Sequence, residues 1–327
     1  MARLAFPLLG QRDRVRGALS RSRRKSVPLT RPFGPTSPPG EVFGALGKHG
    51  ESSQVSSTHL VLIPSYNTGP KLEETIRAAR GVWTPVLVVI DGSTDGSAQT
   101  ALRLAADDPG LRVLIRPRNG GKGRAVLDGL REAEAQGFSH VLTLDADGQH
   151  PVGLIPDFMA ASRANPRALV LGLPVFDATA PRIRLFGRRI ANWWSNLETL
   201  RGGIGDCLCG FRVYPIAALR RIMDGTRFMR GFDFEPEAAI RFSWQGHPLI
   251  NLPAPIRYFT AEEGGVSHFH YGRDNLLLAF MYVRLFAEFL PRLPMLIAAR
   301  KTSGMLPAER LERRRLERIR FAGRPDP

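Results

Sequence analysis

Two aspartates that stand one residue apart are the first feature of the chain that points to chemistry. Asp145 and Asp147 follow the apolar run 141–144 and precede Gly148. In an extended chain the side chains of residues i and i+2 point to the same side, about 6.6 to 6.8 Å apart. Both carboxylates can then face one cation, and such oxygen ligands suit Mg²⁺ or Mn²⁺. The alternative is a solvated turn, because Asp and Gly both favour turns.

Apolar runs that alternate with helical segments surround this pair. The predicted strands are 59–64, 85–91, 111–116, 139–145 and 168–173, and the predicted helices are 71–80, 97–106, 121–136 and 151–164. Strands that are apolar throughout and alternate with helices predict a mostly parallel sheet with helices on both faces. Ligands of such sheets bind outside the carboxyl ends of the strands. Because Tyr66, Asp91 and Asp145 all stand at strand ends, we expect them in one crevice.

The alternation fades after residue 174. Residues 182–200 and 231–245 are predicted helices, whereas 210–214 and 248–258 offer short strands. We interpret this half as an elaboration of one edge of the same sheet, without an internal repeat. Cys207 and Cys209 stand too close for an unstrained disulfide and lack a second ligand pair for zinc, so we expect reduced, buried thiols.

The two ends of the chain hold most of its charge. Of the net charge of +16, residues 1–58 carry +7 and residues 300–327 carry +5, which leaves +4 for the part between. Residues 1–58 are rich in Pro, Gly and Ser, so we expect a disordered basic arm. Residues 59–260 should form the folded domain, 261–300 an amphipathic C-terminal segment, and 301–327 a charged tail. We find no convincing signal peptide and no spanning helix.

Five motifs resemble, in their order along the chain, family 2 glycosyltransferases of the GT-A fold. They are Ile63-Pro-Ser-Tyr-Asn67, Val89-Ile-Asp-Gly-Ser-Thr-Asp95, Asn119-Gly-Gly-Lys-Gly-Arg124, Leu144-Asp-Ala-Asp-Gly-Gln-His-Pro151 and Asp206-Cys-Leu-Cys-Gly-Phe-Arg212. The branch they resemble most contains the dolichyl- and polyprenyl-phosphate mannose or glucose synthases, over about residues 59–260. The resemblance implies a Rossmann-like GT-A domain and an inverting transferase that uses a nucleotide-diphosphate sugar and a divalent cation.

The resemblance also implies a site. The residues implied to bind the nucleotide sugar are Pro64, Tyr66, Asn67, Asp91, Lys122, Asp145 and Ala146. The chain has Ile90 before Asp91 where the family more often has two acids, which leaves the base open between UDP- and GDP-linked donors. Asp145 and Asp147 match the metal-binding Asp-x-Asp motif, and His270, which shares a face with His268 if extended, is implied to complete the shell of Mg²⁺ or Mn²⁺. The cation would stabilise the departing diphosphate.

Asp206 and Arg212 are predicted to be catalytic. Asp206 matches an acceptor-side motif, where an acid can take a proton from an attacking hydroxyl, although an ionised phosphate nucleophile needs no base. The planar fork of Arg212 suits two phosphate oxygens. The alternative is a buried Asp–Arg pair that holds the loop. Glu235 and Glu237 match a further stretch of the family and are candidates for the acceptor side.

The expected acceptor is a lipid-linked group, a polyprenyl phosphate, and the alternative is a hydroxyl of another lipid, a pigment or a polysaccharide. Residues 276–290 are strongly apolar and lie among Arg273, Arg284 and Arg292. Such a helix lies at a bilayer interface with its cations near the head groups. We therefore expect a cytoplasmic protein that is peripherally associated with the inner face of the cytoplasmic membrane.

Other classes fit the motifs less well. A sugar-phosphate nucleotidyltransferase or a dehydrogenase would carry a glycine-rich loop after the first strand, where this chain has Pro64-Ser-Tyr-Asn67. A non-enzymatic protein that binds through its basic ends would be retained on polyanions, and this retention would fall steeply with salt. That hypothesis leaves the strand-end motifs unexplained. No nucleic acid partner is expected.

Overall fold

Alternate residues of the central strand β2 (His59–Ser65) are buried on opposite faces of one sheet. Leu60 and Leu62 belong to one hydrophobic core, whereas Val61 and Ile63 belong to the other. This two-sided burial is the physical reason why the strand is apolar throughout. The structure, a computed structural model, describes residues 53–176, 180, 182–257 and 269–302.

The central sheet has seven strands in the order β5-β4-β2-β6-β8-β7-β9. Besides β2 these are β4 (Val86–Asp91), β5 (Leu111–Arg116), β6 (His140–Thr143), β7 (Leu169–Phe176), β8 (Arg212–Pro215) and β9 (Leu249–Ile256). Strand β8 runs antiparallel to both β6 and β7, and the other neighbours pair in parallel. The predicted class, an α/β fold with a mostly parallel sheet, is confirmed.

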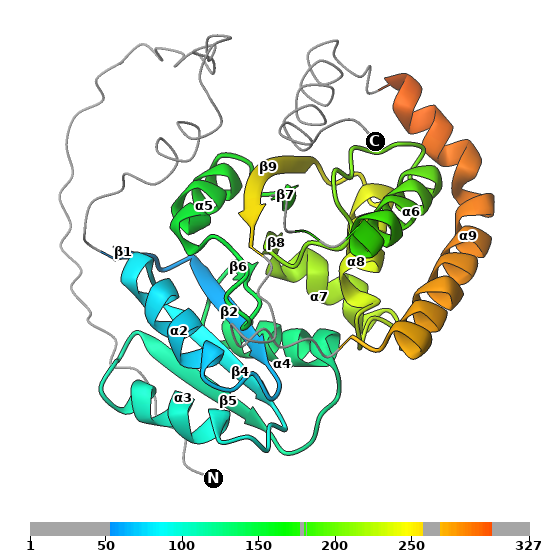
Figure 1. Cartoon of the computed structure of the whole chain (residues 1–327). Helices are drawn as coiled ribbons and strands as arrows, with labels where there is room; N and C mark the ends of the chain where they lie inside the picture. Colours follow the sequence, from blue (N-terminus) through cyan, green and yellow to red (C-terminus); the bar gives the residue numbers. More distant parts are fainter. Residues whose placement is uncertain (1–52, 177–179, 181, 258–268, 303–327) are drawn as a thin grey trace, which may run out of the picture. The chain divides into compact units, whose positions relative to one another are not determined.

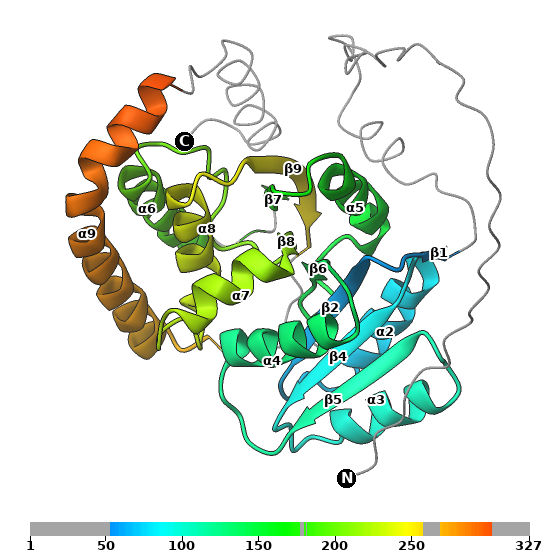
Figure 2. The same ribbon diagram turned by 180° about the vertical axis from the view of Figure 1, so that it is seen from behind.

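Helices cover both faces of the sheet (Figures 1 and 2). One core packs α2 (Lys71–Val82), α3 (Ser97–Ala106) and α5 (Ile155–Ala164, preceded by the short helix η1, Val152–Leu154) against the sheet. The other core contains residues of α4 (Lys122–Ala135), α6 (Arg182–Glu198), α7 (Ile216–Asp224), α8 (Phe234–Trp244) and α9 (Tyr271–Thr302). Among the described residues, none of the helices is apolar over a length that would cross a membrane.

The second half of the chain extends the same sheet, as expected, because β7, β8 and β9 are its last three strands. One boundary differs from the prediction. Strand β1 (Gln54–Val55) pairs with β3 (Trp83–Thr84). The prediction of a disordered arm up to residue 58 is therefore wrong for residues 54–55. The rest of the predicted arm, residues 1–52, lies outside the described residues, as do most of the charged tail and His268. Cys207 and Cys209 are buried free thiols, as predicted.

Two histidines stack at the amino ends of β2 and β6, away from the strand ends that carry the motifs. The rings of His59 and His140 lie 4.4 Å apart and nearly parallel, and His59 Nε2 lies 3.2 Å from the Ser162 hydroxyl. Burial, with smaller contributions from His140 and Arg163, lowers the pKa of His59 to about 4. The folded protein therefore holds His59 neutral, whereas the unfolded chain protonates it near pH 6.5.

Acidification should therefore destabilise the fold through His59. Its contribution is fully present above pH 6.5 and is lost as the pH falls toward 4. We expect wild type to lose about 2 kcal/mol more unfolding free energy between pH 7.5 and pH 5 than the variant His59→Phe, which cannot bind a proton. Urea unfolding at the two pH values measures the difference, and equal losses in both proteins would contradict the assignment.

Candidate active site

A cavity of about 580 Å³ lies at the carboxyl edge of the sheet. Eight of the residues predicted from the sequence line it: Pro64, Tyr66, Asp91, Lys122, Asp145, Ala146, Asp147 and His270. They come from the ends of β2 and β4, the start of α4, the loop after β6 and the residue before α9. The predicted meeting of strand-end side chains in one crevice is confirmed.

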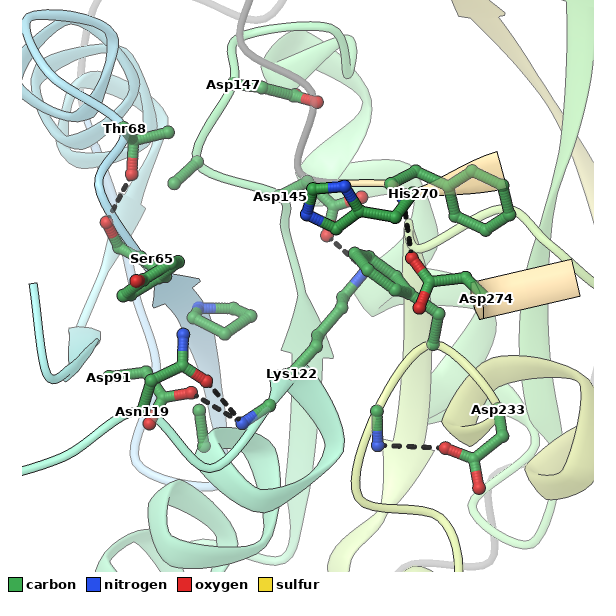
Figure 3. Close-up of a pocket in the computed structure, with 18 of the residues that line it drawn as sticks. Ser65, Thr68, Asp91, Asn119, Lys122, Asp145, Asp147, Asp233, His270 and Asp274 are labelled. Atoms are coloured by element: carbon green, nitrogen blue, oxygen red, sulfur yellow. Dashed lines mark hydrogen bonds and ion pairs between the residues drawn. The ribbon is translucent and has the colours of Figure 1, made fainter. Parts of the chain in front are cut away.

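The ammonium of Lys122 bridges two carboxylates in this cavity. It lies 2.5 Å from Asp145 Oδ1 (Figure 3). It also pairs with Glu235, near the start of α8. The second oxygen of Asp145 lies 3.1 Å from His150 Nε2. Lys122 is the first residue of α4, so this bridge connects α4, the loop after β6 and α8.

Burial and charge set the protonation of these groups. Burial alone would lower the pKa of Lys122, but Asp145 and Glu235 outweigh it and raise that pKa. Burial alone would raise the pKa of Asp145, but Lys122 and the hydrogen bond with His150 hold it far below its usual range. For Asp147, burial and the charge of Asp145 act together and raise the pKa. A further positive charge beside Asp147 would stabilise its ionised carboxylate and so lower this pKa.

Glycine at position 210 allows the Lys122–Asp145 pair to form. A Cβ atom at Gly210 would lie 2.6 Å from Asp145 Oδ2 and 2.8 Å from Lys122 Nζ. The backbone after Cys209 therefore packs directly against the ion pair. This close approach is a packing reason for the glycine in the motif that ends at Arg212.

Asp91 holds the turn that starts α4. Its carboxylate pairs with Arg116 and accepts hydrogen bonds from the backbone N–H groups of Gly120, at 3.0 Å, and Gly121, at 2.9 Å. Asp91 is 2% exposed, so it borders the cavity while its oxygens serve the protein itself. Its predicted contact with the nucleoside stays a prediction.

Asn67 lies beside the cavity and not among its lining residues. Its Oδ1 accepts a hydrogen bond of 2.7 Å from the backbone N–H of Thr94, and its own backbone N–H donates to the hydroxyl of Ser93. These contacts join the loop after β2 to the loop after β4. The residue thus positions the neighbouring Tyr66.

Asp206 and Arg212 lie away from the cavity lining, and both are 0% exposed. The Asp206 carboxylate pairs with Arg188 and accepts hydrogen bonds from the side chain of Asn192 and the backbone N–H groups of Leu208 and Cys209. Their direct action on a substrate stays a prediction, and these contacts favour a role in holding the loop.

Arg212 pairs with backbone groups and not with the carboxylate of Asp206. It donates to the carbonyl oxygens of Cys209 at 2.7 Å, Glu235 at 2.6 Å and Asp206 at 3.3 Å. Two of these carbonyls belong to the loop that carries Gly210, and the third belongs to the start of α8. The alternative of a simple Asp–Arg pair therefore needs a correction: Arg212 binds the backbone carbonyl of Asp206, while the carboxylate of Asp206 pairs with Arg188.

The predicted metal ligands line the same cavity without forming a ready-made cage. Asp147 Oδ1 accepts a hydrogen bond from the backbone N–H of Gln149 at 3.0 Å, and the backbone N–H of His270 donates to Asp274 at 2.7 Å. Among the described residues no group of three or more His, Cys, Asp or Glu side chains has metal-binding geometry. Mg²⁺ needs no such cage, because it binds through one or two carboxylates plus substrate phosphates and water.

Several lining residues were not predicted. They are Ser65, Thr68, Asn119, Gly121, Ala125, Gln149, Arg184, Gly231, Phe232, Asp233, Phe269, Arg273, Asp274 and Leu277. Asn119 and Phe232 belong to stretches that the resemblance covers, so the family motifs could have identified them. Arg184 and Arg273 stand in the first turns of α6 and α9, and no local sequence signal separates them from other arginines. Glu235 reaches the bridge, whereas Glu237 points to Arg241 and Arg284.

Removing the charge of Asp206 should unfold the loop and not simply slow a reaction. Because Asp206→Asn leaves the Arg188 guanidinium without its buried carboxylate, we expect a loss of about 3 kcal/mol in unfolding free energy. The control Glu74→Gln removes an exposed pair with Lys71 and should cost less than about 1 kcal/mol. Urea unfolding measures both; an Asp206→Asn protein of wild-type stability would favour a direct catalytic role.

Comparison with known proteins agrees with this geometry. Residues 60–228 match the model of Glycosyl transferase family 2. Polyprenol monophosphomannose synthase of Mycolicibacterium smegmatis is 30% identical over 70% of this chain and 87% of its own length. Undecaprenyl-phosphate mannosyltransferase of Micrococcus luteus is 29% identical over 59% of this chain and 81% of its own length.

A solved structure is also similar. Glucosyl-3-phosphoglycerate synthase from Mycobacterium tuberculosis, crystallised with Mn²⁺ and uridine diphosphate, is 19% identical and has a TM-score of 0.46 over 72% of this chain and 80% of its own. The family model covers more than half of the chain and includes all five motifs of the cavity and the loop beside it. The chain therefore belongs to Glycosyl transferase family 2 and is a glycosyltransferase.

Proposed function

We propose that this glycosyltransferase moves a sugar from a nucleoside diphosphate to a polyprenyl phosphate, with a divalent cation and with inversion at the anomeric carbon. The observation that carries the proposal is the grouping of Lys122, Asp145 and Asp147 in one cavity. The names of the two relatives, undecaprenyl-phosphate mannosyltransferase and polyprenol monophosphomannose synthase, support the acceptor class. The donor is UDP- or GDP-linked.

The charge of the cavity supports a divalent cation. Asp145, Asp147 and Glu235 place three carboxylates around the single ammonium of Lys122. This local excess of negative charge favours a further cation where a diphosphate would bind. The residues present fit Mg²⁺ or Mn²⁺, with Asp147 and Asp145 as its carboxylate ligands and His270 as a third ligand. When bound, the cation would neutralise charge on the leaving diphosphate.

The proposed reaction is one displacement. An oxygen of the acceptor phosphate attacks the anomeric carbon while the bond from that carbon to the diphosphate oxygen breaks. The bonding electron pair leaves with the nucleoside diphosphate, and attack from the opposite face inverts the anomeric carbon. A phosphate monoester is ionised near pH 7, since its second pKa is about 6, so the protein need not supply a base.

The remaining residues position the reactants. Arg184 and Arg273 line the cavity and supply positive charge that suits the acceptor phosphate. Asp206 and Arg212 hold the loop that carries Gly210 and hence the Lys122–Asp145 pair. Because a polyprenyl acceptor resides in a bilayer, the protein works at a membrane surface, which we assign to the inner face of the cytoplasmic membrane.

A donor screen tests the proposed function. The full chain is incubated with UDP- and GDP-linked sugars, Mg²⁺ or Mn²⁺, and either a polyprenyl phosphate or the corresponding polyprenol. We expect release of nucleoside diphosphate and a glycosylated lipid phosphate with one donor, and no transfer to the alcohol. Transfer to the alcohol alone would support the alternative of a hydroxyl acceptor and contradict the proposal.

Loss of the Asp147 charge should weaken cation binding. Asp147→Asn should lower kcat/KM about 100-fold, because the divalent cation that stabilises the transition state loses a ligand. Its unfolding free energy should change by less than about 1 kcal/mol, as should that of the control Asp107→Asn, an exposed position. Because the pKa of Asp147 is raised, the Mn²⁺ concentration for half-maximal rate should increase as the pH falls. Near-wild-type transfer by Asp147→Asn would show that the cation assignment is wrong.

Crowding the ion pair should separate activity from stability. Gly210→Ala places a Cβ against the ends of two flexible side chains, Asp145 and Lys122, which can shift at small cost to folding. We expect at least about tenfold slower transfer with a change below about 1 kcal/mol in unfolding free energy. The control Gly153→Ala adds a Cβ that meets nothing within 4 Å. If both variants keep the wild-type rate, the geometry of the pair does not matter for transfer.

A further inference from the structure

Helix α9 has the charged side chains of Arg284 and Glu288 turned toward the protein. Arg284 donates to Glu288 at 3.1 Å and pairs with Glu237, and Arg241 of α8 donates to Glu288 at 2.9 Å. The Arg284 side chain is only 13% exposed. Arg292 also pairs with Glu288 and lies over the Trp244 ring. The expectation that Arg284 reaches lipid head groups is therefore wrong, because Glu237 of α8 and Glu288 of α9 hold its guanidinium inside the protein.

The outer side of α9 is apolar. Between residues 275 and 297 the charged side chains are at most 38% exposed, the value for Arg292, whereas Arg284 is 13% and Glu288 is 30% exposed. Six of the large hydrophobic side chains on this side are 43–72% exposed: Leu276, Phe280, Val283, Leu290, Met295 and Ile297. A surface helix of a water-soluble protein normally shows the reverse pattern, with its charges outside. This inverted pattern indicates that α9 contacts an apolar phase or partner.

Helix α6 has a second apolar line on its solvent side. Its members recur every three or four residues and are 37–66% exposed: Ile183, Phe186, Ile190, Trp193 and Leu197. The opposite side of the helix contains the buried residues Leu185, Ala191 and Ser195. The spacing places the five hydrophobic side chains on one stripe. Helix α6 therefore has apolar side chains on its exposed side as well as on its buried side.

The two lines border each other. The rings of Trp193 and Trp194 lie 5.1 Å apart, and Trp194 lies 6.1 Å from Phe286 of α9. The two helices also lie side by side in Figures 1 and 2. We call the exposed hydrophobic side chains of the two lines together the apolar face. Contiguous exposed apolar patches of this kind mark interaction sites.

The charges on these helices select the partner. Among the side chains that the structure describes, the exposed charged residues of α6 and α9 are Arg189 and Arg273. The acids are buried or paired: Glu198 is 0% exposed, Asp274 is 7% exposed, and Glu288 pairs with arginines. Arginines beside an apolar face complement anionic lipid head groups. A second copy of the chain would instead bring like charges together, and Pro291 and Pro294 interrupt the regular seam that paired helices need.

The apolar face begins at the cavity. Arg184 in the first turn of α6 and Arg273 and Leu277 in the first two turns of α9 line that cavity. We propose that α6 and α9 together dock on an anionic bilayer, with the apolar face in the interface and the cavity opening toward the head groups. This inference deepens the proposed function, because it names the surface through which a lipid acceptor reaches the site.

Vesicle binding by the full chain tests the docking surface. Wild type is floated with vesicles of phosphatidylglycerol and phosphatidylcholine, next to Phe186→Asp on α6, Val283→Asp on α9 and the control Leu102→Asp on α3, which is also exposed. We expect each variant on the apolar face to reduce the vesicle-bound fraction about tenfold or more, because it loses one buried hydrophobic contact. The control should bind like wild type, and neutral vesicles should bind less of every protein.

A second measurement does not depend on the three aspartate variants. Trp193 lies on the apolar face and is 59% exposed, whereas Trp83 is 0% and Trp244 is 8% exposed. Lipids brominated on their acyl chains should quench wild-type fluorescence, and Trp193→Phe should lose most of that quenching. Absence of quenching with bound vesicles would place the bilayer elsewhere and overturn the proposal.

Other outcomes are equally decisive. Equal loss of binding in Leu102→Asp, or unchanged binding in Phe186→Asp, would overturn a face formed by both helices. A wild-type dimer that Val283→Asp dissociates, without vesicle binding, would assign the face to a second copy. Release of nucleoside diphosphate with a short, water-soluble prenyl phosphate and no vesicles should be the same in wild type and these variants. That assay fails only if the proposed function fails, so the two proposals are tested separately.

Discussion

One buried ammonium connects the parts of the protein that form the site. Lys122 starts α4 and contacts Asp145 after β6 and Glu235 at the start of α8. In a partly desolvated cavity this lysine and its carboxylates depend on each other, because each would be costly to bury alone. The bridge therefore fixes the loop after β6 relative to helices from both halves of the chain. With Asp147 beside it, the cluster retains an excess of negative charge that a divalent cation can balance.

Backbone geometry supports the bridge. Asp91 accepts hydrogen bonds from Gly120 and Gly121 and so fixes the turn from which Lys122 extends. On the opposite side, Gly210 lets the chain pass directly against the ion pair. The buried contacts of Arg212 hold that passing segment. Many of the polar residues in the motifs thus serve to hold the polypeptide around the cavity.

Some of this arrangement follows from the sequence. Strands such as β2 are apolar throughout because both faces are buried, and that pattern alone predicts a covered, mostly parallel sheet. Strand-end residues meet because parallel strands share one carboxyl edge, which is why Tyr66, Asp91 and Asp145 could be placed together. The antiparallel direction of β8 was not predictable, since four residues carry no signal of direction.

The other features depend on tertiary partners. The motif predicts that Asp206 is catalytic, but in the structure its carboxylate pairs with Arg188 and accepts a hydrogen bond from Asn192, both of α6. The sequence pattern predicts that the arginines of α9 contact lipid head groups. In the structure the acids that turn them inward come partly from α8, more than forty residues away. Local patterns cannot show which side of a helix a distant segment will cover. The apolar face depends on those distant partners, so the sequence alone did not predict it.

The central claim is that the anionic cluster needs a divalent cation before it can hold a nucleoside diphosphate. Calorimetric titration of the full chain with UDP- and GDP-linked sugars, in Mn²⁺ and again in excess chelator, tests it most directly. We expect the preferred donor to bind with Mn²⁺ and chelation to weaken its binding at least about tenfold. Equally tight binding of that donor in chelator would contradict it.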